Sequence, residues 1–246
     1  MKYMGSKARI AKYILPIIQK RLADYNIHTY IEPFSGGMNM IDKVRCEHKI
    51  ASDNNEYLIE IFKNMDKLES MLPEMVSKEH YDECRKAYYN KDFSNFPQWY
   101  IGAIGFLASY SGRFYSGGFN GQSYLDGMSK RCYYDEAKRN LLKQLPSLEG
   151  IDFVYGDYEE LYSNKTDCLF YCDIPYKSVK QYDTSINFDY DRFWNWAEKM
   201  SEKNIVLVSE YIAPDNWDCI WSKPLLKTMN HGNNVNSVEK LFELRE

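Results

Sequence analysis

Short apolar runs alternate with helical patterns near both ends of this chain. The apolar runs that we interpret as buried strands are residues 29–31, 49–51, 151–155, 169–172 and 205–208. The helical patterns that accompany them are residues 38–44, 57–65 and 193–200. Strands that alternate with helices are typical of a parallel sheet covered by helices. The sequence therefore predicts an α/β fold.

The middle of the chain interrupts this alternation. Residues 67–144 have a largely helical pattern, but the stretch from Gly102 to Gly127 holds seven of the 13 Gly residues. Within it, residues 110–121 show no periodicity, so we expect them to lie outside the core. Long, aromatic-rich loops of this kind are commonly functional. We predict an α/β domain made of residues 1–66 and 145–246, with an inserted helical, loop-rich domain at 67–144.

The overall charge argues only weakly against a nucleic-acid partner. The 246 residues include 31 Lys and Arg against 35 Asp and Glu, a net charge of −4. Residues 1–23, however, contain six basic residues and no acidic one. Isoleucines at roughly helical spacing in this stretch predict an amphipathic helix with a positive face. For any single one of these charges, a solvated helix face is the alternative.

Two other classes of protein are disfavoured. No stretch approaches the roughly 20 apolar residues of a membrane-spanning helix, so we expect no membrane partner and a cytoplasmic location. The six Cys form no CxxC pair and lack a His at zinc-site spacing, so no metal is expected. The sequence does not fix the oligomeric state, and a monomer is favoured.

A glycine turn and an acidic residue follow the first two predicted strands. Residues 32–38 come after a strand and open a predicted helix, where Gly36 and Gly37 let backbone amides approach a ligand. Asp53 follows the second strand, about 17 residues later, where it is placed to bind ribose hydroxyls. Its alternative is an N-cap for the helix that begins near Asn55. Together, the turn and the carboxylate favour a nucleoside ligand.

The apolar run 169–172 ends abruptly in Asp173, Ile174, Pro175 and Tyr176. This places a carboxylate, a rigid turn and an aromatic ring at the carboxyl edge of the sheet, where open α/β sheets bind ligands. A purely structural turn gains nothing from an exposed Tyr at this position. The tetrad therefore favours a functional role.

Together these segments resemble the DNA adenine methylases, which transfer a methyl group from S-adenosylmethionine to the 6-amino group of adenine in DNA. Five segments match in the family's order. Residues 3–7 resemble its aromatic-x-Gly-Gly-Lys element, 32–37 its Pro-Phe-x-Gly-x-Gly cofactor loop, 52–55 its ribose-binding Asp-x-Asn, 156–158 its Gly-Asp-Phe element and 173–176 its catalytic Asp-Pro-Pro-Tyr. The resemblance spans nearly the whole chain and implies a Rossmann-like methyltransferase sheet.

The resemblance also implies roles for individual residues. The cofactor would be S-adenosyl-L-methionine, bound by Tyr3, Lys7, Glu32, Phe34, Ser35, Gly36, Gly37, Asp53, Asn54, Asp157, Tyr158 and Asp173. The catalytic residues would be Asp173, Ile174, Pro175 and Tyr176. In the family, the Asp carboxylate and the next carbonyl accept the two hydrogens of the target amine. Neither a metal nor a covalent nucleophile is required.

Three residues depart from the family pattern: Ser6, Met38 and Ile174 replace a Gly, a Gly and a Pro. The carbonyl of residue 174 is present whatever its side chain, and Pro175 still favours an extended residue 174. We therefore expect activity to survive. The alternatives are a catalytically impaired relative that only binds DNA, and an amino-methyltransferase that acts on RNA.

The insertion lies between the cofactor loop and the catalytic tetrad, which makes it the expected target-recognition region. Its candidate DNA-binding residues are Tyr110, Arg113, Tyr115, Asn120, Lys130 and Arg131. Arg reads guanine through a bidentate contact, aromatic side chains wedge into the base stack, and further basic residues hold phosphates. The expected partner is double-stranded DNA with its target adenine flipped out. The recognition sequence stays open, as does a role in restriction, phage protection or solitary methylation.

Overall fold

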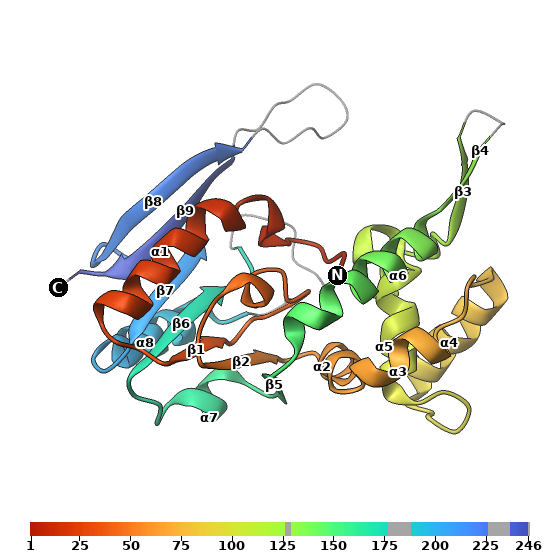
Figure 1. Ribbon diagram of the computed structural model, residues 1–246, viewed down its shortest axis with the longest axis horizontal. Coiled ribbons are helices and arrows are strands. Elements are labelled where there is room, and N and C mark those ends of the chain that lie inside the picture. Colours follow the sequence, from red (N-terminus) through yellow and green to blue (C-terminus); the bar gives the residue numbers. More distant parts are fainter. Residues whose placement is uncertain (126–128, 177–187, 226–236, 246) are drawn as a thin grey trace. The chain divides into compact units, whose positions relative to one another are not determined.

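The computed structural model describes residues 1–125, 129–176, 188–225 and 237–245 (Figure 1), with only the backbone at 122–125, 129–131, 225 and 237. The chain divides into two compact units. The first comprises residues 1–11, 35–43 and 55–155, and the second residues 12–34, 44–54 and 156–246. We describe each unit by itself. The domain boundaries expected from the sequence stay a prediction.

An open, mostly parallel sheet forms the second unit. Its strands are β1 (Thr29–Glu32), β2 (His48–Asp53), β6 (Cys168–Asp173), β7 (Ile205–Glu210), β8 (Trp217–Leu225) and β9 (Ser237–Leu244). They lie in the order β2-β1-β6-β7-β9-β8. The first four run parallel, whereas β9 is antiparallel to both β7 and β8. The predicted Rossmann-like α/β fold is confirmed.

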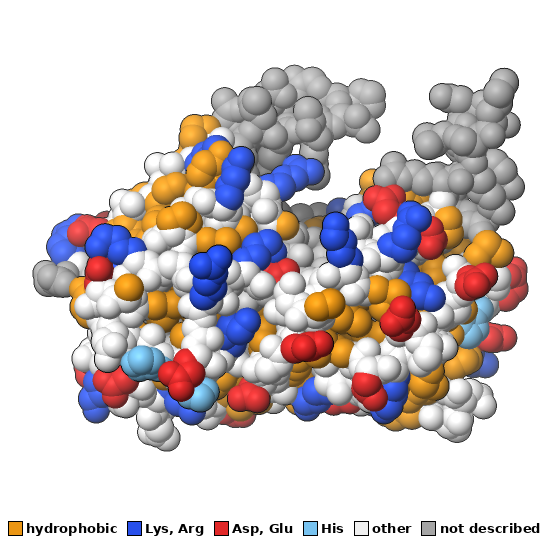
Figure 2. All heavy atoms as spheres, viewed as in Figure 1, with side chains coloured by type: hydrophobic (Ala, Val, Ile, Leu, Met, Phe, Trp, Pro, Cys, Tyr) orange, Lys and Arg blue, Asp and Glu red, His pale blue; other side chains and the backbone are white. Residues whose placement is uncertain are grey.

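Helices cover the sheet of the second unit. They are α1 (Ala11–Asp24), α7 (Tyr158–Tyr162) and α8 (Tyr190–Ser201). Helix α1 buries Ile14 and Ile18, contains Pro16, and carries Lys and Arg side chains on the face seen in Figure 2. Helix α8 buries Phe193 and Trp196 in the core against β6. No helix among the described residues is long and apolar enough to cross a membrane.

Strand β8 contacts both α8 and α1, because its register against β9 shifts midway along the strand. Trp217 packs on Trp194 of α8, with ring centres 5.0 Å apart. Trp221 instead stacks on Tyr13 of α1, with ring centres 6.1 Å apart. The two Trp residues are four positions apart and would share one face of a regular strand. A bulge between Cys219 and Trp221 places them on opposite faces.

The first unit is mainly helical. Its helices are α2 (Glu56–Lys63), α3 (Met65–Met71), α4 (Lys78–Asn90), α5 (Gln98–Leu107) and α6 (Tyr133–Gln144), with short 3₁₀ turns at Lys7–Arg9, Ile41–Lys43, Tyr110–Gly112 and Leu145–Leu148. Its strands are β3 (Gln122–Leu125), β4 (Ser129–Cys132) and β5 (Ile151–Tyr155). Helix α5 lies close to α2. A Cβ atom at Gly102 of α5 would lie only 2.5 Å from the Tyr57 carbonyl oxygen, which shows how closely the two helices pack. The antiparallel pair β3–β4 was not predicted.

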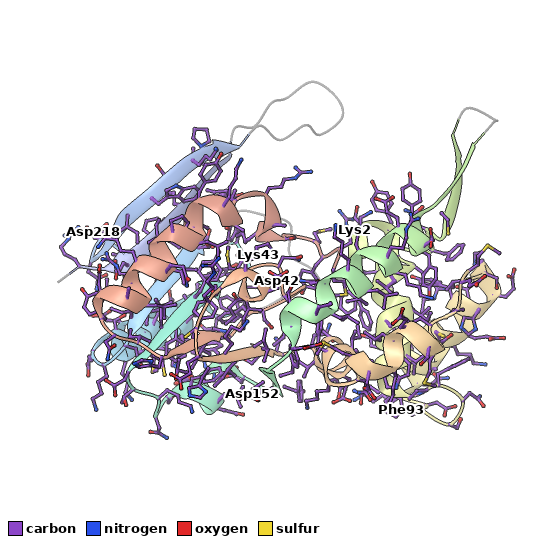
Figure 3. All side chains as sticks on the ribbon, in the orientation of Figure 1. Lys2, Asp42, Lys43, Phe93, Asp152 and Asp218 are labelled. Carbon is purple, nitrogen blue, oxygen red and sulfur yellow. The ribbon has the colours of Figure 1, made fainter. Side chains whose placement is uncertain are left out.

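The helix predicted for residues 38–44 is wrong. Only the 3₁₀ turn Ile41–Lys43 forms there, because Met38 has a φ of 58°, which an α-helix does not accommodate. The turn is anchored by Gln144, whose Nε2 donates to the Met38 carbonyl (2.8 Å) and to the Asp42 carboxylate (3.0 Å). Asp42 also pairs with Lys43 at 2.5 Å (Figure 3). Periodicity reports side-chain spacing and not backbone φ, which is why the sequence misleads here.

The expectation that residues 110–121 lie outside the core is wrong in part. Tyr115 is only 3% exposed, and its hydroxyl donates to the Ile101 carbonyl at 2.8 Å. Phe114 stacks on Phe106 of α5, with ring centres 4.7 Å apart. Tyr110, in contrast, is 54% exposed. The segment therefore contributes alternately to the core and to the surface of the first unit.

Candidate active site

Three carboxylates stand at the carboxyl ends of neighbouring strands in the second unit. Glu32, Asp53 and Asp173 are the last residues of β1, β2 and β6. Because these strands are parallel and β1 lies between the other two, the three ends share one edge of the sheet. The order reverses between β1 and β6, and open α/β sheets bind ligands in the crevice at such a reversal. This edge is the candidate site.

Glu32 is held by its own strand. Its side chain is buried, 3% exposed, and the Tyr30 hydroxyl donates to its Oε1 at 2.7 Å. Burial and the adjacent Glu32 carboxylate raise the pKa of Tyr30 well above its usual value. Tyr30 therefore stays protonated and keeps donating. A buried carboxylate with a fixed donor is pre-oriented at the edge of the sheet.

Asp53 is not the cap of the following helix. The N-cap of α2 is Asn55, whose Oδ1 accepts from the Leu58 amide at 3.2 Å. Asp53 is 8% exposed, and its backbone carbonyl accepts from the Gly156 amide at 3.2 Å. Residues 52–54 and 156–158 therefore meet, as expected of segments that share one ligand. Asn54 is exposed beside them.

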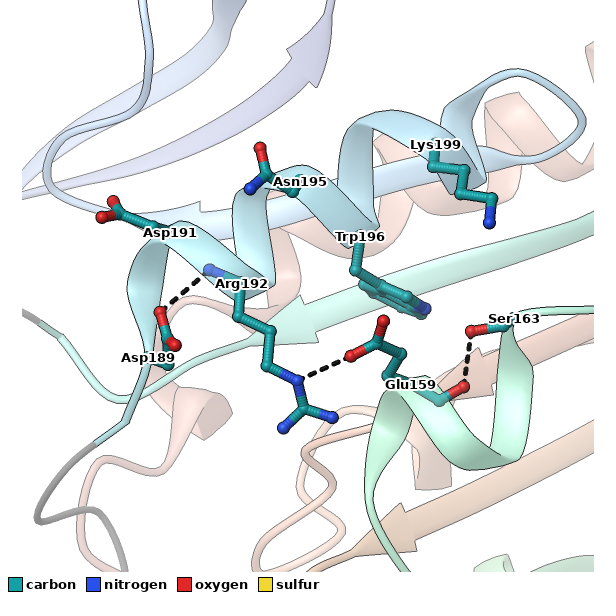
Figure 4. Close-up of a pocket in the computed structure, with 8 residues that line it drawn as sticks. All are labelled: Glu159, Ser163, Asp189, Asp191, Arg192, Asn195, Trp196 and Lys199. Atoms are coloured by element: carbon teal, nitrogen blue, oxygen red, sulfur yellow. Dashed lines mark hydrogen bonds and ion pairs between the residues drawn. The ribbon is translucent and has the colours of Figure 1, made fainter.

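Asp157 is fixed by helix α8. Its Oδ1 accepts from the Glu159 amide at 3.0 Å and so caps α7. The Arg192 guanidinium holds both carboxylate oxygens of Asp157, at 2.7 and 3.1 Å. It also binds Glu159 Oε2 at 2.6 Å (Figure 4). These carboxylates raise the pKa of Arg192. The guanidinium also lies 5.3 Å from the ring centre of Tyr158. Arg192, which the sequence did not point to, therefore orients both Asp157 and Tyr158.

Phe34 and Tyr158, both expected at the cofactor, are in contact. Their ring centres lie 5.2 Å apart, and Tyr158 is 6% exposed. Phe188 packs on Phe34 at 5.8 Å and on Tyr158 at 6.4 Å. Burial raises the pKa of the Tyr158 hydroxyl. Close to the end of β1, the second unit thus offers an apolar, aromatic wall.

A polar hollow of about 570 Å³ opens between α7 and α8 (Figure 4). It is lined by Glu159, Ser163, Asp189, Asp191, Arg192, Asn195, Trp196 and Lys199. None of the residues expected at the cofactor or in catalysis lines it. Its connection to the site is indirect, through Arg192 and Asp157. The carboxylate edge, and not this hollow, is therefore the candidate active site.

The tetrad at the end of β6 is anchored residue by residue. Asp173 is the last strand residue, in register with Ser209 of β7. Ile174 is 2% exposed and belongs to the hydrophobic core. The Pro175 carbonyl accepts from the Tyr190 hydroxyl at 2.8 Å. The apolar core position explains how Ile is accommodated where the family pattern has Pro.

Tyr176 is held by residues that sequence analysis assigned no catalytic role. Its hydroxyl donates to Glu239 Oε2 at 2.6 Å, and its ring meets Tyr211 edge to face at 4.4 Å. The Tyr211 hydroxyl reaches Glu239 Oε1 at 3.4 Å. Burial, Asp173 and Glu239 raise the pKa of Tyr176 well above its usual value. One feature of the sequence indicated that Glu239 points inward: it lies on the same face of β9 as Leu241, which is buried.

The glycine turn lies in the first unit from Ser35 onward. A Cβ at Gly36 would lie 2.8 Å from Tyr3 Cε1, and one at Gly37 would lie 2.6 Å from Tyr3 Cβ. Both distances are too short for real Cβ contacts, and Gly36 has a φ of 46°. The structure therefore brings together three residues that we expected to bind the cofactor: Tyr3, Gly36 and Gly37. Ser35 and Lys7 are also largely buried, 6% and 9% exposed.

The expected DNA-binding residues of the first unit divide into three groups. Arg113 and Tyr110 are exposed, with the guanidinium 6.0 Å from the Tyr110 ring centre. Tyr115 is buried, which supports a structural role, and Asn120 is half-buried, with its backbone N–H donating to the Ala108 carbonyl. Lys130 and Arg131 lie on β4, but their side chains are outside the described residues. DNA contact by any of them stays a prediction.

Comparison with known proteins decides the family. Residues 3–209 match the family described as D12 class N6 adenine-specific DNA methyltransferase. The chain belongs to this family. The part of the chain that matches the D12 class contains the carboxylate edge and the tetrad, whereas Glu239 lies beyond it. The resemblance expected from the five motifs is confirmed.

This D12 chain is similar to two proteins that are named as methyltransferases or methylases. Type II methyltransferase M.FokI from Planomicrobium okeanokoites is 26% identical over 194 residues, covering 72% of this chain and 28% of that protein. Modification methylase StsI from Streptococcus sanguinis is 27% identical over 189 residues, with the same coverage. The chain thus spans a little over a quarter of the length of these relatives.

Proposed function

We propose that this chain transfers a methyl group from S-adenosyl-L-methionine to the 6-amino group of an adenine extruded from duplex DNA. The observation that carries the proposal is the anchored tetrad: Asp173 ends β6, and Tyr176 is hydrogen-bonded to Glu239 at 2.6 Å. Membership of the D12 class supports the reaction type. The names of the two relatives support a modification role.

The residues at the carboxylate edge fit the cofactor. Asp53 is buried at a strand end and its carboxylate does not cap α2, so it suits ribose hydroxyls. Asp157 and Tyr158, held by Arg192, suit the adenine ring and its amine. The remaining proposed cofactor residues are Tyr3, Lys7, Glu32, Phe34, Ser35, Gly36, Gly37, Asn54 and Asp173. When bound, S-adenosylmethionine supplies the electrophilic methyl group.

The tetrad would prepare the amine for attack. The lone pair of an exocyclic adenine amine is delocalised into the ring, which makes the nitrogen a poor nucleophile. Hydrogen bonds from its two hydrogens to the Asp173 carboxylate and the Ile174 carbonyl favour a pyramidal nitrogen with an available lone pair. The nitrogen must lose one proton after transfer, and the Asp173 carboxylate is a suitable acceptor. Positioning and electrostatics then supply most of the rate.

Tyr176 would hold the extruded base. Extrusion costs a few kcal/mol, and an aromatic ring stacked on the base returns about 1–3 kcal/mol. Because Glu239 and Tyr211 fix the ring, little side-chain entropy is lost when the base arrives. In the first unit, we propose that residues 67–144 select the target, with Tyr110, Arg113, Asn120, Lys130 and Arg131 as candidate contacts and Tyr115 supporting their loop.

Incubation with labelled S-adenosylmethionine and mixed-sequence duplex DNA tests the proposal. We expect label on adenine N6, identified by nucleoside mass spectrometry, and loss of this signal in Asp173→Ala. DNA binding without any label transfer would support the catalytically impaired alternative. Label on RNA but not on duplex DNA would support the RNA alternative. Either result would overturn the proposed function.

A further inference from the structure

A basic and aromatic patch lies where α1 meets β8 in the second unit. We call it the α1–β8 patch, and it consists of Lys12, Tyr13, Trp221 and Lys223. The Nζ atoms of Lys223 and Lys12 lie 3.5 and 5.0 Å from the centre of the Tyr13 ring. Trp221 stacks beside the same ring with 25° between the planes. One aromatic ring thus holds two ammonium groups.

Among the residues that the structure describes, the two ammonium groups of the patch form no ion pair. Neither Lys12 nor Lys223 pairs with a carboxylate of any residue that the structure describes. Elsewhere on α1, in contrast, Lys20 pairs with Asp24 at 2.5 Å and Arg21 with Glu243 at 2.6 Å. A hydrogen bond from Lys223 and the charge of Lys12 lower the pKa of Tyr13. The patch is therefore locally positive, within the Lys- and Arg-rich surface over α1 and β8 in Figure 2.

The patch adjoins the tetrad through the sheet. Lys223 on β8 is in register with Glu239 on β9, and directly opposed residues of antiparallel strands have Cβ atoms about 5 Å apart. Glu239 is the carboxylate that accepts the hydrogen bond of Tyr176. The bulge before Trp221 turns this part of β8 toward α1, which brings Trp221 and Tyr13 together. The positive charge thus lies one strand away from the anchor of the stacking ring.

We propose that the α1–β8 patch binds the phosphodiester backbone of duplex DNA beside the extruded nucleotide. This inference rests on the proposed function, because it takes Tyr176 as the ring that meets the base. Lys ammonium groups bind phosphates as point charges and fix the position of the duplex without reading its sequence. Two such groups on a rigid aromatic support lose little freedom on binding. This contact is distinct from the residues proposed for target selection in the first unit.

The test is the salt dependence of DNA binding by the full chain. We compare the wild type with the double variant Lys12→Gln/Lys223→Gln, using fluorescence anisotropy on a mixed-sequence duplex over a series of NaCl concentrations. Loss of two phosphate contacts should reduce the slope of log K against log salt by about 1.8 and weaken binding about tenfold at low salt. The variant Lys12→Arg/Lys223→Arg should retain the wild-type slope.

A matched control separates the patch from net charge. Lys20→Gln/Lys165→Gln also removes two exposed Lys residues of the second unit, and its slope should stay near that of the wild type. Cofactor binding within about twofold of wild type would show that each variant is folded. Unchanged salt dependence in the patch variant, with methyl transfer intact in the wild type, would overturn this inference alone. A wild type that neither binds nor methylates DNA would overturn the proposed function as well.

Discussion

The hydroxyl of Tyr176 donates to Glu239 Oε2 at 2.6 Å, across 63 positions of sequence. We expect Glu239→Ala to raise KM for DNA and lower kcat/KM about 10- to 100-fold, because it leaves a part-buried hydroxyl without its acceptor. Glu239→Gln keeps a carbonyl acceptor and should retain most activity. Steady-state kinetics with varied DNA give both values. Loss of cofactor affinity in Glu239→Ala would contradict a role confined to Tyr176 and its neighbour Tyr211.

Asp173 and Asp53 should separate catalysis from cofactor binding. We expect Asp173→Ala to abolish methyl transfer while the cofactor Kd stays within a few-fold, because Asp173 acts mainly on the target amine. Asp53→Ala should do the reverse, weakening cofactor binding with kcat largely retained at saturation. Calorimetric titration and single-turnover transfer measure the two effects. Equal loss of cofactor affinity in both variants would be incompatible with the proposed roles.

Ile174 should matter more for stability than for chemistry. Its side chain is 2% exposed in the core, so Ile174→Ala should lower the free energy of unfolding by about 2–5 kcal/mol. Methyl transfer should persist below the melting temperature, because the backbone carbonyl remains. Ile174→Val is the matched control, with an expected cost of about 0.5–1.5 kcal/mol. Urea unfolding and transfer assays on the same samples test this; a folded but inactive Ile174→Ala would count against it.

Arg192 should affect the cofactor and not the base. Arg192→Ala frees Asp157 and Tyr158 from the guanidinium that orients them, so we expect cofactor Kd to rise a few-fold with little change in KM for DNA. Arg192→Lys should rescue only in part, because an ammonium group cannot hold both carboxylate oxygens in the same planar geometry. Lys199→Ala, in the same hollow, is the control. An unchanged cofactor Kd would refute the positioning role.

Buried tyrosines should make the chain sensitive to alkali. Burial raises the pKa of Tyr30 and Tyr171 well above 10.0, near which the unfolded side chains ionise. Below pH 10 both side chains are protonated in the folded and the unfolded state, so they contribute fully to the free energy of unfolding. Above pH 10 this contribution falls by up to about 1.4 kcal/mol per pH unit for each tyrosine. Urea unfolding at several pH values should show this fall. Tyr171→Phe should reduce the slope, whereas the exposed Tyr25→Phe should not.

The sequence predicted those parts of the site that adjoin strand ends. Asp53 and Asp173 follow apolar runs, and parallel strands necessarily bring such residues to one edge. The partners that orient them were not predictable, because Arg192 is 35 positions from Asp157 and Glu239 is 63 positions from Tyr176. Such pairs depend on how helices and strands pack in three dimensions. Spacing along the chain carries no record of them.

Backbone conformation set a second limit on prediction. Met38 fits a helical pattern of apolar residues, but its left-handed φ ends any helix at that point. Tyr115 lies in a Gly-rich, aperiodic stretch and is nevertheless buried, because the Ile101 carbonyl offers a partner for its hydroxyl. In both cases local composition suggested one environment and tertiary contacts imposed another.

The position of β9 between β7 and β8 has a consequence for how the protein is made. The second unit draws on three separated stretches of chain, and its sheet lacks an internal strand until residues 237–244 have been synthesised. Much of the first unit, at residues 55–155, has by then long left the ribosome. Folding should therefore be sequential during translation, with the helical unit first. Because Glu239 lies on β9, the ring of Tyr176 acquires its anchor only after this strand has been made.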